Sequence, residues 1–224
     1  MKADFKNSPI LITGIERSGS SIIGKIISSC EVYTGKTTEM AENKALKKLV
    51  SSYYTSVLKV PENGQIPLPK TNDLDIPITW TSLIEKILQK EGYTGDIPWM
   101  YKSSKVMQIW PVWNYSFPNA KYIIVRRRTP DIIQSCLKTG YMNAYDTSEG
   151  WLSWIHKQEK LFVEMIENGL NCKQIWPERM VNNDYSQVYE MLEWLGLSWN
   201  TEAIVNLVTP LLKNSTQKIK EVIR

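Results

Sequence analysis

The chain has 224 residues, a net charge of +4, 42% hydrophobic residues and 22% charged residues. This length and balance are typical of a folded globular chain and exclude a disordered one. The positive excess fits an anionic ligand but is too small for a protein that coats nucleic acid, so we expect no nucleic-acid partner. We expect one domain over residues 1–224.

The sequence offers little for a metal site, a disulfide framework or a membrane anchor. The three cysteines, Cys30, Cys136 and Cys172, are widely spaced and odd in number, which favours a reduced compartment. His156 is the single histidine, so a histidine-based metal site is not expected. Residues 1–7 are too polar and too few for a signal peptide, and no apolar run approaches a membrane span. We therefore expect a cytoplasmic protein with no metal and no membrane partner.

The first pattern along the chain is an apolar strand, a polar turn and an apolar helix. Residues 10–13 form a continuous apolar run, as in a strand buried on both faces, and isoleucines recur at helical spacing within residues 18–29. Between them, Gly14 and Gly19 have the spacing of a phosphate-binding loop. Such a loop directs backbone N–H groups at an anion, and the following helix adds its positive end.

This glycine loop (residues 14–21) departs from the pattern of nucleotide triphosphatases at one position. Ser20 follows Gly19 where an ATPase or kinase has lysine, and the nearest cation is Arg17, inside the loop. We expect an anion site formed by the loop backbone, Arg17 and the hydroxyl groups of Ser18, Ser20 and Ser21.

The middle of the chain is predicted as short elements joined by one long loop. Apolar periodicity and turn residues predict a strand at 31–33, a capped helix start at 37–42 with the helix continuing over 40–58, a loop at 61–70, a helix at 79–90, a strand at 99–102 and a helix at 106–115.

A second strand-to-helix turn carries a cluster of cations. Residues 121–125 form a buried apolar strand that runs directly into Arg126, Arg127 and Arg128. Residues 129–131 have the threonine, proline and aspartate typical of a helix start. We call residues 126–135 the arginine segment. Beyond it the pattern predicts a helix at 150–168, a strand at 174–176, a helix at 187–195 and a basic, polar tail after Pro210.

Strands that alternate with helices predict an α/β fold with three layers, in which a mostly parallel central sheet is flanked by helices on both faces. In such sheets ligands bind beyond the carboxyl ends of the strands. The glycine loop and the arginine segment both follow strands at that edge. We therefore expect one ligand with two separated anionic groups to span both.

Several segments resemble those of sulfotransferases that use 3′-phosphoadenosine 5′-phosphosulfate (PAPS). Residues 14–21 are similar to the family's 5′-phosphosulfate loop. Residues 117–131 with Ser135 resemble its 3′-phosphate segment, in which an apolar strand ends in arginine and a serine lies on the next helix. Residues 101–105 are similar to its third landmark strand, and residues 176–197 to its C-terminal strand and helix. The resemblance covers residues 8–30 and 99–197 and implies a P-loop-type fold.

This resemblance implies transfer of a sulfuryl group from PAPS to a hydroxyl or amine of a small-molecule or carbohydrate acceptor, with adenosine 3′,5′-bisphosphate as product. A sulfuryl group carries less charge than a γ-phosphoryl group, so cationic side chains and backbone dipoles are expected to suffice without metal. The resemblance assigns the donor 5′-phosphosulfate to Arg17 and to the loop residues Ser18, Gly19, Ser20 and Ser21.

The resemblance assigns Lys102 to the bridging or sulfuryl oxygens and Ser135 to the 3′-phosphate. The arginine that joins Ser135 stays open between two candidates. A family pattern with arginine eight residues before the serine selects Arg127, and one with arginine two residues before Pro130 selects Arg128.

The general base is the largest departure from the family pattern. Small-molecule sulfotransferases place a histidine just after the lysine of the third strand, and Ser104 stands in that neighbourhood here. Carbohydrate sulfotransferases commonly use a glutamate after the second strand, where this chain has Glu39 and Glu42. Both stay open as the catalytic carboxylate, with Glu39 favoured, since a carboxylate poised near neutral pH can accept the acceptor's proton.

Two other functions fit parts of the pattern. A nucleotide-dependent kinase with an unusual loop would explain the glycine spacing, although the loop lacks lysine and no clear aspartate is placed for Mg²⁺. A non-catalytic module that binds a nucleotide or polyanion on the same fold would explain the missing histidine.

Overall fold

The computed structural model describes residues 8–61, 65–202 and 204–208. Within these residues, four strands form one parallel sheet in the order β2-β1-β3-β4. They are β1 (Ile10–Gly14), β2 (Met100–Lys102), β3 (Lys121–Val125) and β4 (Cys172–Ile175). Every residue of β1 and β2 is buried, which explains the largely apolar sequence of β1; β2 ends in the buried Lys102.

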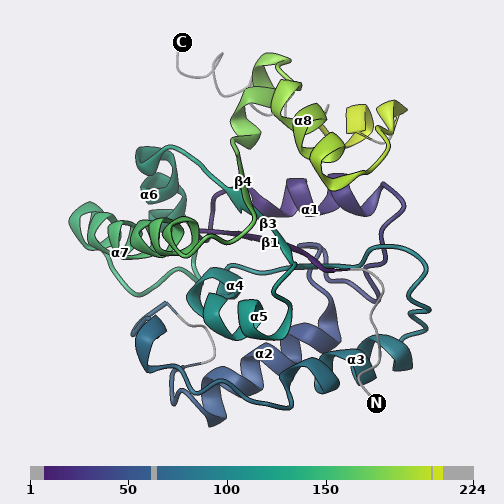
Figure 1. The fold of residues 1–224 in the computed structure, drawn as a ribbon. Coiled ribbons are helices and arrows are strands. Elements are labelled where there is room, and N and C mark those ends of the chain that lie inside the picture. Colours follow the sequence, from purple (N-terminus) through teal and green to yellow (C-terminus); the bar gives the residue numbers. More distant parts are fainter. Residues whose placement is uncertain (1–7, 62–64, 203, 209–224) are drawn as a thin grey trace.

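Helices cover both faces of the sheet, which confirms the predicted three-layer α/β fold. Helices α1 (Ser20–Ser28) and α8 (Ser186–Leu195) lie on one face, as Figure 1 shows. The opposite face is covered by α2 (Lys44–Ser56), α3 (Trp80–Lys90), α4 (Lys105–Gln108) and α5 (Trp110–Ser116). Helix α6 (Thr129–Leu137) packs beside the long helix α7 (Ser148–Glu167). The two short 3₁₀ helices are η1 (Thr71–Asp73) and η2 (Pro177–Asn182).

Alternate residues of each strand enter two separate cores. On β1, Ile10 and Ile12 pack with the isoleucines of α1 and with α8, whereas Leu11 packs with the helices of the opposite face. On β3, Ile123 and Ile124 divide in the same way. This alternation follows from the two-residue period of a strand, which divides its side chains between the two faces of the sheet.

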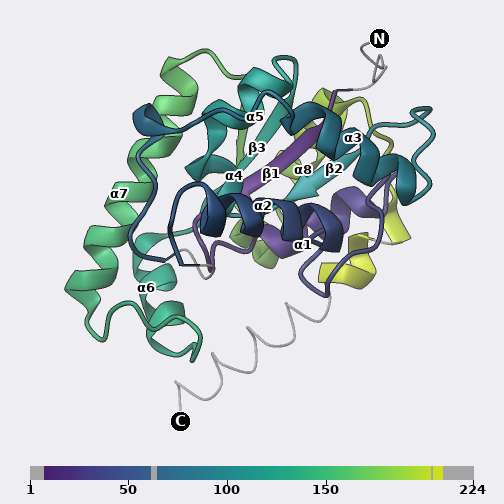
Figure 2. The ribbon, with the colours of Figure 1, turned by 90° about the horizontal axis from the view of Figure 1, so that it is seen from below.

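The strand register brings the candidate site together. Gly14 at the end of β1 pairs with Val125 at the end of β3, and Ile12 pairs with Lys102 at the end of β2. Because all four strands are parallel, the glycine loop, the arginine segment and the residues after Lys102 leave the sheet at the same edge. Figure 2 shows α2 running across the sheet near this edge.

Three predicted elements differ from the structure. The strand at 31–33 is only an isolated bridge between Tyr33 and Trp99, because the chain turns at Gly35, whose φ is 62°. The helix predicted over 40–58 is α2, which begins only at Lys44. Residue Ala41 has a left-handed φ of 58°, and Asn43 caps the helix by accepting the Leu46 N–H at 2.8 Å.

The helix predicted at 106–115 is divided into α4 and α5. Pro111 stands in the first turn of α5, where it is tolerated, but it cannot continue a preceding helix. The remaining helices and strands lie close to their predicted bounds. The basic tail after Pro210 and residues 62–64 of the predicted loop lie outside the described residues.

Candidate active site

The glycine loop has a backbone shaped by left-handed residues. Arg17 and Gly19 have φ values of 71° and 91°, and the Ser18 N–H donates to the Ile15 carbonyl at 3.0 Å. Such successive turns gather N–H groups around a concavity that suits an anion. Helix α1 begins directly afterwards with no acidic residue in its first turn, so its positive end is uncompensated from within the helix.

Gly14 is required by close packing at the start of the loop. A Cβ atom there would lie 2.6 Å from both the Ser18 Oγ and the Val125 carbonyl oxygen. The absence of a side chain therefore lets the glycine loop lie against the end of β3. Ser18 is 3% exposed, and its Oγ has no hydrogen-bond partner among the described residues. An unsatisfied buried hydroxyl in this position fits a loop that binds an oxyanion.

The two predicted anion sites meet directly. The Arg17 Nε donates to the Ser135 Oγ at 2.8 Å, although the two residues lie on different elements. Arg127 Nη1 donates to the main-chain carbonyl of Arg17 at 2.7 Å. A third contact joins Arg17 Nη1 to the Tyr141 hydroxyl at 2.9 Å. The glycine loop and the arginine segment therefore share one rim.

Arg126 and Arg128 point to other partners. Arg126 Nη2 lies 3.3 Å from the Glu159 carboxylate, and its guanidinium carbon is 5.1 Å from the centre of the Phe162 ring. The Arg128 side chain is 71% exposed and pairs with Asp131 at 2.8 Å. Arg127 is thus the member of the arginine triplet whose side chain contacts the glycine loop.

Lys102 ends β2 as a buried cation at the sheet edge. It is 6% exposed, and its Nζ lies 3.4 Å from Glu42 Oε1. Burial lowers the pKa of Lys102 from its usual value, and the neighbouring Glu42 carboxylate opposes that shift. Helix α1 passes close by, since a Cβ atom on Gly24 would lie 3.6 Å from the Lys102 Cγ.

The two predicted glutamates differ in their surroundings. Glu42 lies between two ammonium groups, since its Oε2 is 3.0 Å from Lys47 Nζ and its Oε1 faces Lys102. Glu39 is exposed, and no polar contact of its side chain is found among the described residues. The structure thus brings Glu42, and not Glu39, to Lys102.

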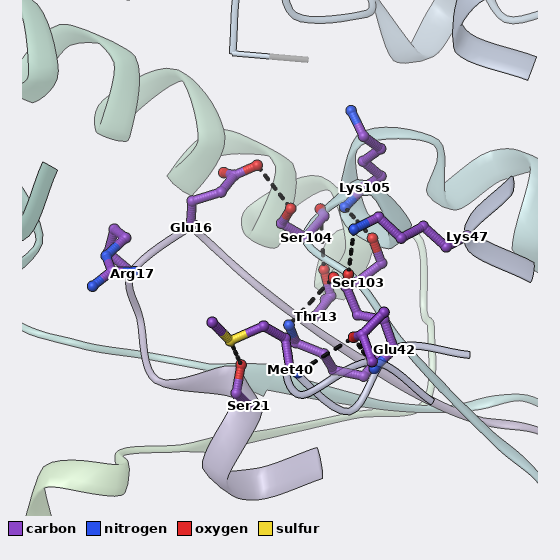
Figure 3. Close-up of polar contacts among 12 residues, drawn as sticks. Thr13, Glu16, Arg17, Ser21, Met40, Glu42, Lys47, Ser103, Ser104 and Lys105 are labelled. Carbon is purple, nitrogen blue, oxygen red and sulfur yellow. Dashed lines mark hydrogen bonds and ion pairs between the residues drawn. The ribbon is translucent and has the colours of Figure 1, made fainter. Parts of the chain in front are cut away.

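Ser20 and Ser21 open α1 at the rim. Ser20 is half-buried in the first turn of the helix. The Ser21 Oγ lies 3.5 Å from the Met40 Sδ, so the segment before α2 reaches over the start of α1 (Figure 3).

One further carboxylate at the site, Glu16, was not singled out from the sequence. The Ser104 hydroxyl donates to Glu16 Oε1 at 2.7 Å, and Oε2 is enclosed with no hydrogen-bond partner among the described residues. Burial raises the pKa of Glu16, and the Ser104 hydrogen bond partly offsets that rise. Its only signal in the sequence is an acidic side chain inside a loop suited to anions.

A cavity of about 270 Å³ adjoins these groups. Its lining includes Glu16 from the glycine loop, Glu42 from the segment before α2, and Ser103, Ser104 and Lys105 after β2. The cavity therefore lies between the loop that carries Arg17 and the strand end that carries Lys102.

The described residues contain neither a cluster of metal-ligating side chains nor a helix that could cross a membrane. Within residues 8–61, 65–202 and 204–208, no group of three or more histidine, cysteine, aspartate or glutamate side chains is arranged to hold a metal ion. In the same part of the chain, no helix has both the length and the apolar character needed to cross a membrane.

Comparisons with known proteins identify a family model that matches the chain and solved structures that share its fold. The model described as "Sulfotransferase family" matches residues 9–201. Solved structures with a similar fold include the sulfotransferase domain of the olefin synthase from Synechococcus PCC 7002, with 16% identity, a TM-score of 0.60 and coverage of 92% of this chain and 80% of that one. Sulfotransferase STF9 from Mycobacterium avium has 11% identity, a TM-score of 0.58 and coverage of 92% and 68%. Sulfotransferase STF1 from Mycobacterium tuberculosis H37Rv has 13% identity, a TM-score of 0.54 and coverage of 91% and 71%. No curated protein sequence matches the chain.

Proposed function

The chain belongs to the sulfotransferase family, and from that membership we propose that it transfers a sulfuryl group from PAPS to a hydroxyl or amine of an acceptor. One observation supports a single donor that contacts both anion sites. The Arg17 guanidinium donates to Ser135 at 2.8 Å while Arg127 donates to the Arg17 carbonyl at 2.7 Å, so both anion sites lie along the same rim.

Donor binding is assigned to both sides of this rim. The N–H groups of Gly19, Ser20 and Ser21, with the Ser18 hydroxyl and the Arg17 side chain, would hold the 5′-phosphosulfate at the positive end of α1. The buried Ser18 hydroxyl, which has no partner among the described residues, fits this role. Arg127 and Ser135 would hold the 3′-phosphate. We favour Arg127 over Arg128 because Arg128 is directed at Asp131.

When bound, this donor supplies an activated sulfuryl group whose leaving group is a phosphate. Lys102 would stabilise the negative charge that develops on the leaving oxygen, because a fixed cation in a buried site acts without solvent reorganisation. Glu42 holds the Lys102 ammonium in place at 3.4 Å. Arg17 and Lys102 would thus fix the donor from two sides of the sheet edge.

The acceptor is proposed to enter the cavity of about 270 Å³ between the glycine loop and the end of β2. Its polar lining, which includes Ser103, Ser104 and Lys105, suits a small molecule or the end of a carbohydrate that presents a hydroxyl or amine.

The experiment that tests this function is transfer of label from ³⁵S-labelled PAPS to a panel of sugars, phenols and amines. We expect labelled product with at least one class. In parallel, adenosine 3′,5′-bisphosphate without metal should raise the melting temperature, as a ligand that binds only the folded state does. Stabilisation by ATP with Mg²⁺ and not by the bisphosphate would instead support a kinase. Binding of the bisphosphate with no transfer, even to water, would favour the non-catalytic module.

A further inference from the structure

Glu16 has a position that donor binding does not explain. It stands in the glycine loop beside Arg17, yet a carboxylate opposes the binding of an anion. Figure 3 shows the Glu16 carboxylate directed at Ser104, away from the side chain of Arg17. The loop therefore presents its cation and its carboxylate to different partners.

The Glu16 carboxylate is only half satisfied. Its Oε1 accepts from the Ser104 hydroxyl at 2.7 Å, while Oε2 is enclosed without a partner among the described residues. Leaving a buried carboxylate oxygen unpaired is costly, and such groups are found at catalytic and ligand-binding sites. Glu16 lines the cavity in which the acceptor is proposed to bind.

Glu42 and Glu39 are less suited to accept a proton there. The charge of Glu42 is already compensated by Lys47 at 3.0 Å and Lys102 at 3.4 Å. Protonating Glu42 would also release Lys102 from its place. Glu39 is exposed and, among the described residues, makes no polar contact that would orient it.

We propose that Glu16 is the general base of the transfer reaction, an inference that rests on the proposed function. The Glu16 carboxylate takes the proton from the acceptor hydroxyl or amine as the acceptor's oxygen or nitrogen forms a bond to sulfur. The bond between sulfur and the bridging phosphate oxygen breaks, and its electron pair leaves with adenosine 3′,5′-bisphosphate. The products are the sulfated acceptor, the bisphosphate and a protonated Glu16, so atoms and charges balance.

The charged and titratable groups around Glu16 come from several elements. Lys102 at the end of β2 and Lys105 in α4 both favour its ionised form. Tyr54 of α2 and Cys136 of α6 are near enough for the Glu16 charge to raise their pKa values further. Burial dominates and raises the pKa of Glu16 above its usual value, which is the direction that strengthens a carboxylate as a base.

The first test replaces Glu16 with glutamine, which keeps its shape but cannot accept the proton. Release of ³⁵S-sulfate from labelled PAPS, with water as acceptor, should fall about 10²- to 10⁴-fold, the usual contribution of a general base. Transfer to any acceptor found in the panel should fall in the same way. Affinity for adenosine 3′,5′-bisphosphate should stay within about threefold of wild type. The exposed Glu31 gives a matched control, and Glu31→Gln should change neither quantity.

The second test moves the pKa of the proposed base without removing it. Because the Ser104 hydrogen bond lowers the pKa of Glu16, Ser104→Ala should raise it. A base is active when deprotonated, so the acid limb of the pH–rate profile should shift to higher pH in Ser104→Ala. The limb should disappear in Glu16→Gln. A merely structural Glu16 would alter the melting temperature in these variants and leave the acid limb where it is.

The outcomes separate this proposal from the function on which it rests. Wild-type protein that neither binds the bisphosphate nor releases sulfate would overturn the sulfotransferase mechanism itself. Wild-type turnover with a Glu16→Gln variant that keeps half or more of it would overturn only the role of Glu16. Loss of the acid limb in Glu42→Gln or Glu39→Gln, with Glu16→Gln unaffected, would assign the base to that residue instead.

Discussion

Replacing Arg17 with alanine isolates the contribution of one side chain to donor binding. The Arg17 guanidinium donates to Ser135 at 2.8 Å and to Tyr141 at 2.9 Å, and both contacts are lost in the variant. The contact from Arg127 is made to the main-chain carbonyl of residue 17, so it persists and still anchors the glycine loop. Any loss of affinity can therefore be attributed to the missing guanidinium group.

The size of the effect follows from the contacts this guanidinium would make with the 5′-phosphate. A charge-assisted hydrogen bond contributes about 1.5–3 kcal/mol. Loss of one such bond weakens binding about 10- to 150-fold, since every 1.4 kcal/mol is a factor of ten. Arg17 is half-buried, so solvent screens its charge in part. We therefore expect a loss of affinity toward the lower end of this range.

Isothermal titration calorimetry with adenosine 3′,5′-bisphosphate measures this loss directly. The matched control is Arg179→Ala. It removes an arginine of η2 whose Nε forms an ion pair with Asp184 at 2.8 Å. We expect the control to stay within about twofold of wild type. Equal affinity of wild type and Arg17→Ala, with both proteins folded, would refute the assignment of Arg17 to the donor.

Three further changes test separate parts of the site. Lys102→Met should lower sulfate release from labelled PAPS by about 10²-fold or more, because it removes a cation that stabilises the charge developing on the leaving oxygen. Its affinity for adenosine 3′,5′-bisphosphate should change less than tenfold. Full turnover in this variant would exclude a catalytic role for Lys102. Arg127→Ala should weaken bisphosphate binding, measured by calorimetry, at least about tenfold more than Arg128→Ala. The reason is that Arg127 contacts the glycine loop, whereas the Arg128 side chain is 71% exposed. A larger loss in Arg128→Ala would instead assign the 3′-phosphate to Arg128. Gly14→Ala should lower the free energy of unfolding by about 1–3 kcal/mol, measured by denaturant titration. The added Cβ would lie 2.6 Å from the Ser18 Oγ and from the Val125 carbonyl oxygen. An unchanged unfolding midpoint would show that the loop tolerates a side chain at this position.

The layers of the fold were predictable because the two central strands, β1 and β3, are short and mostly apolar. Residues 10–13 and 121–125 have no polar alternation to confuse with a helix, and both are followed by glycine or arginine at the sheet edge. The start of α2 was not predictable from propensity. The Thr38 hydroxyl accepts hydrogen bonds from the Met40 and Glu42 N–H groups at 3.3 Å, as a capping threonine does. This is why residues 37–42 look like a helix start in the sequence. The left-handed Ala41 then delays the helix to Lys44.

For the candidate site, the sequence indicated which segments lie together but not which side chains meet. Spacing placed Arg17 and Ser135 near one ligand, and the structure brings them into contact. The sequence of three consecutive arginines did not indicate where each side chain points. Tertiary packing places Arg126 near the Phe162 ring and Arg127 at the glycine loop. Glu16 was not recognised from the sequence because the orientation of its side chain depends on the backbone of a tight turn. That backbone includes the left-handed residues Arg17 and Gly19, which sequence patterns do not identify.

A crystal structure with adenosine 3′,5′-bisphosphate bound tests most directly whether one nucleotide spans both anion sites. We predict the 5′-phosphate against the N–H groups at the start of α1, within hydrogen-bond distance of Arg17, and the 3′-phosphate between Arg127 and Ser135. A nucleotide whose two phosphates both lie away from this shared rim would contradict the proposed donor site.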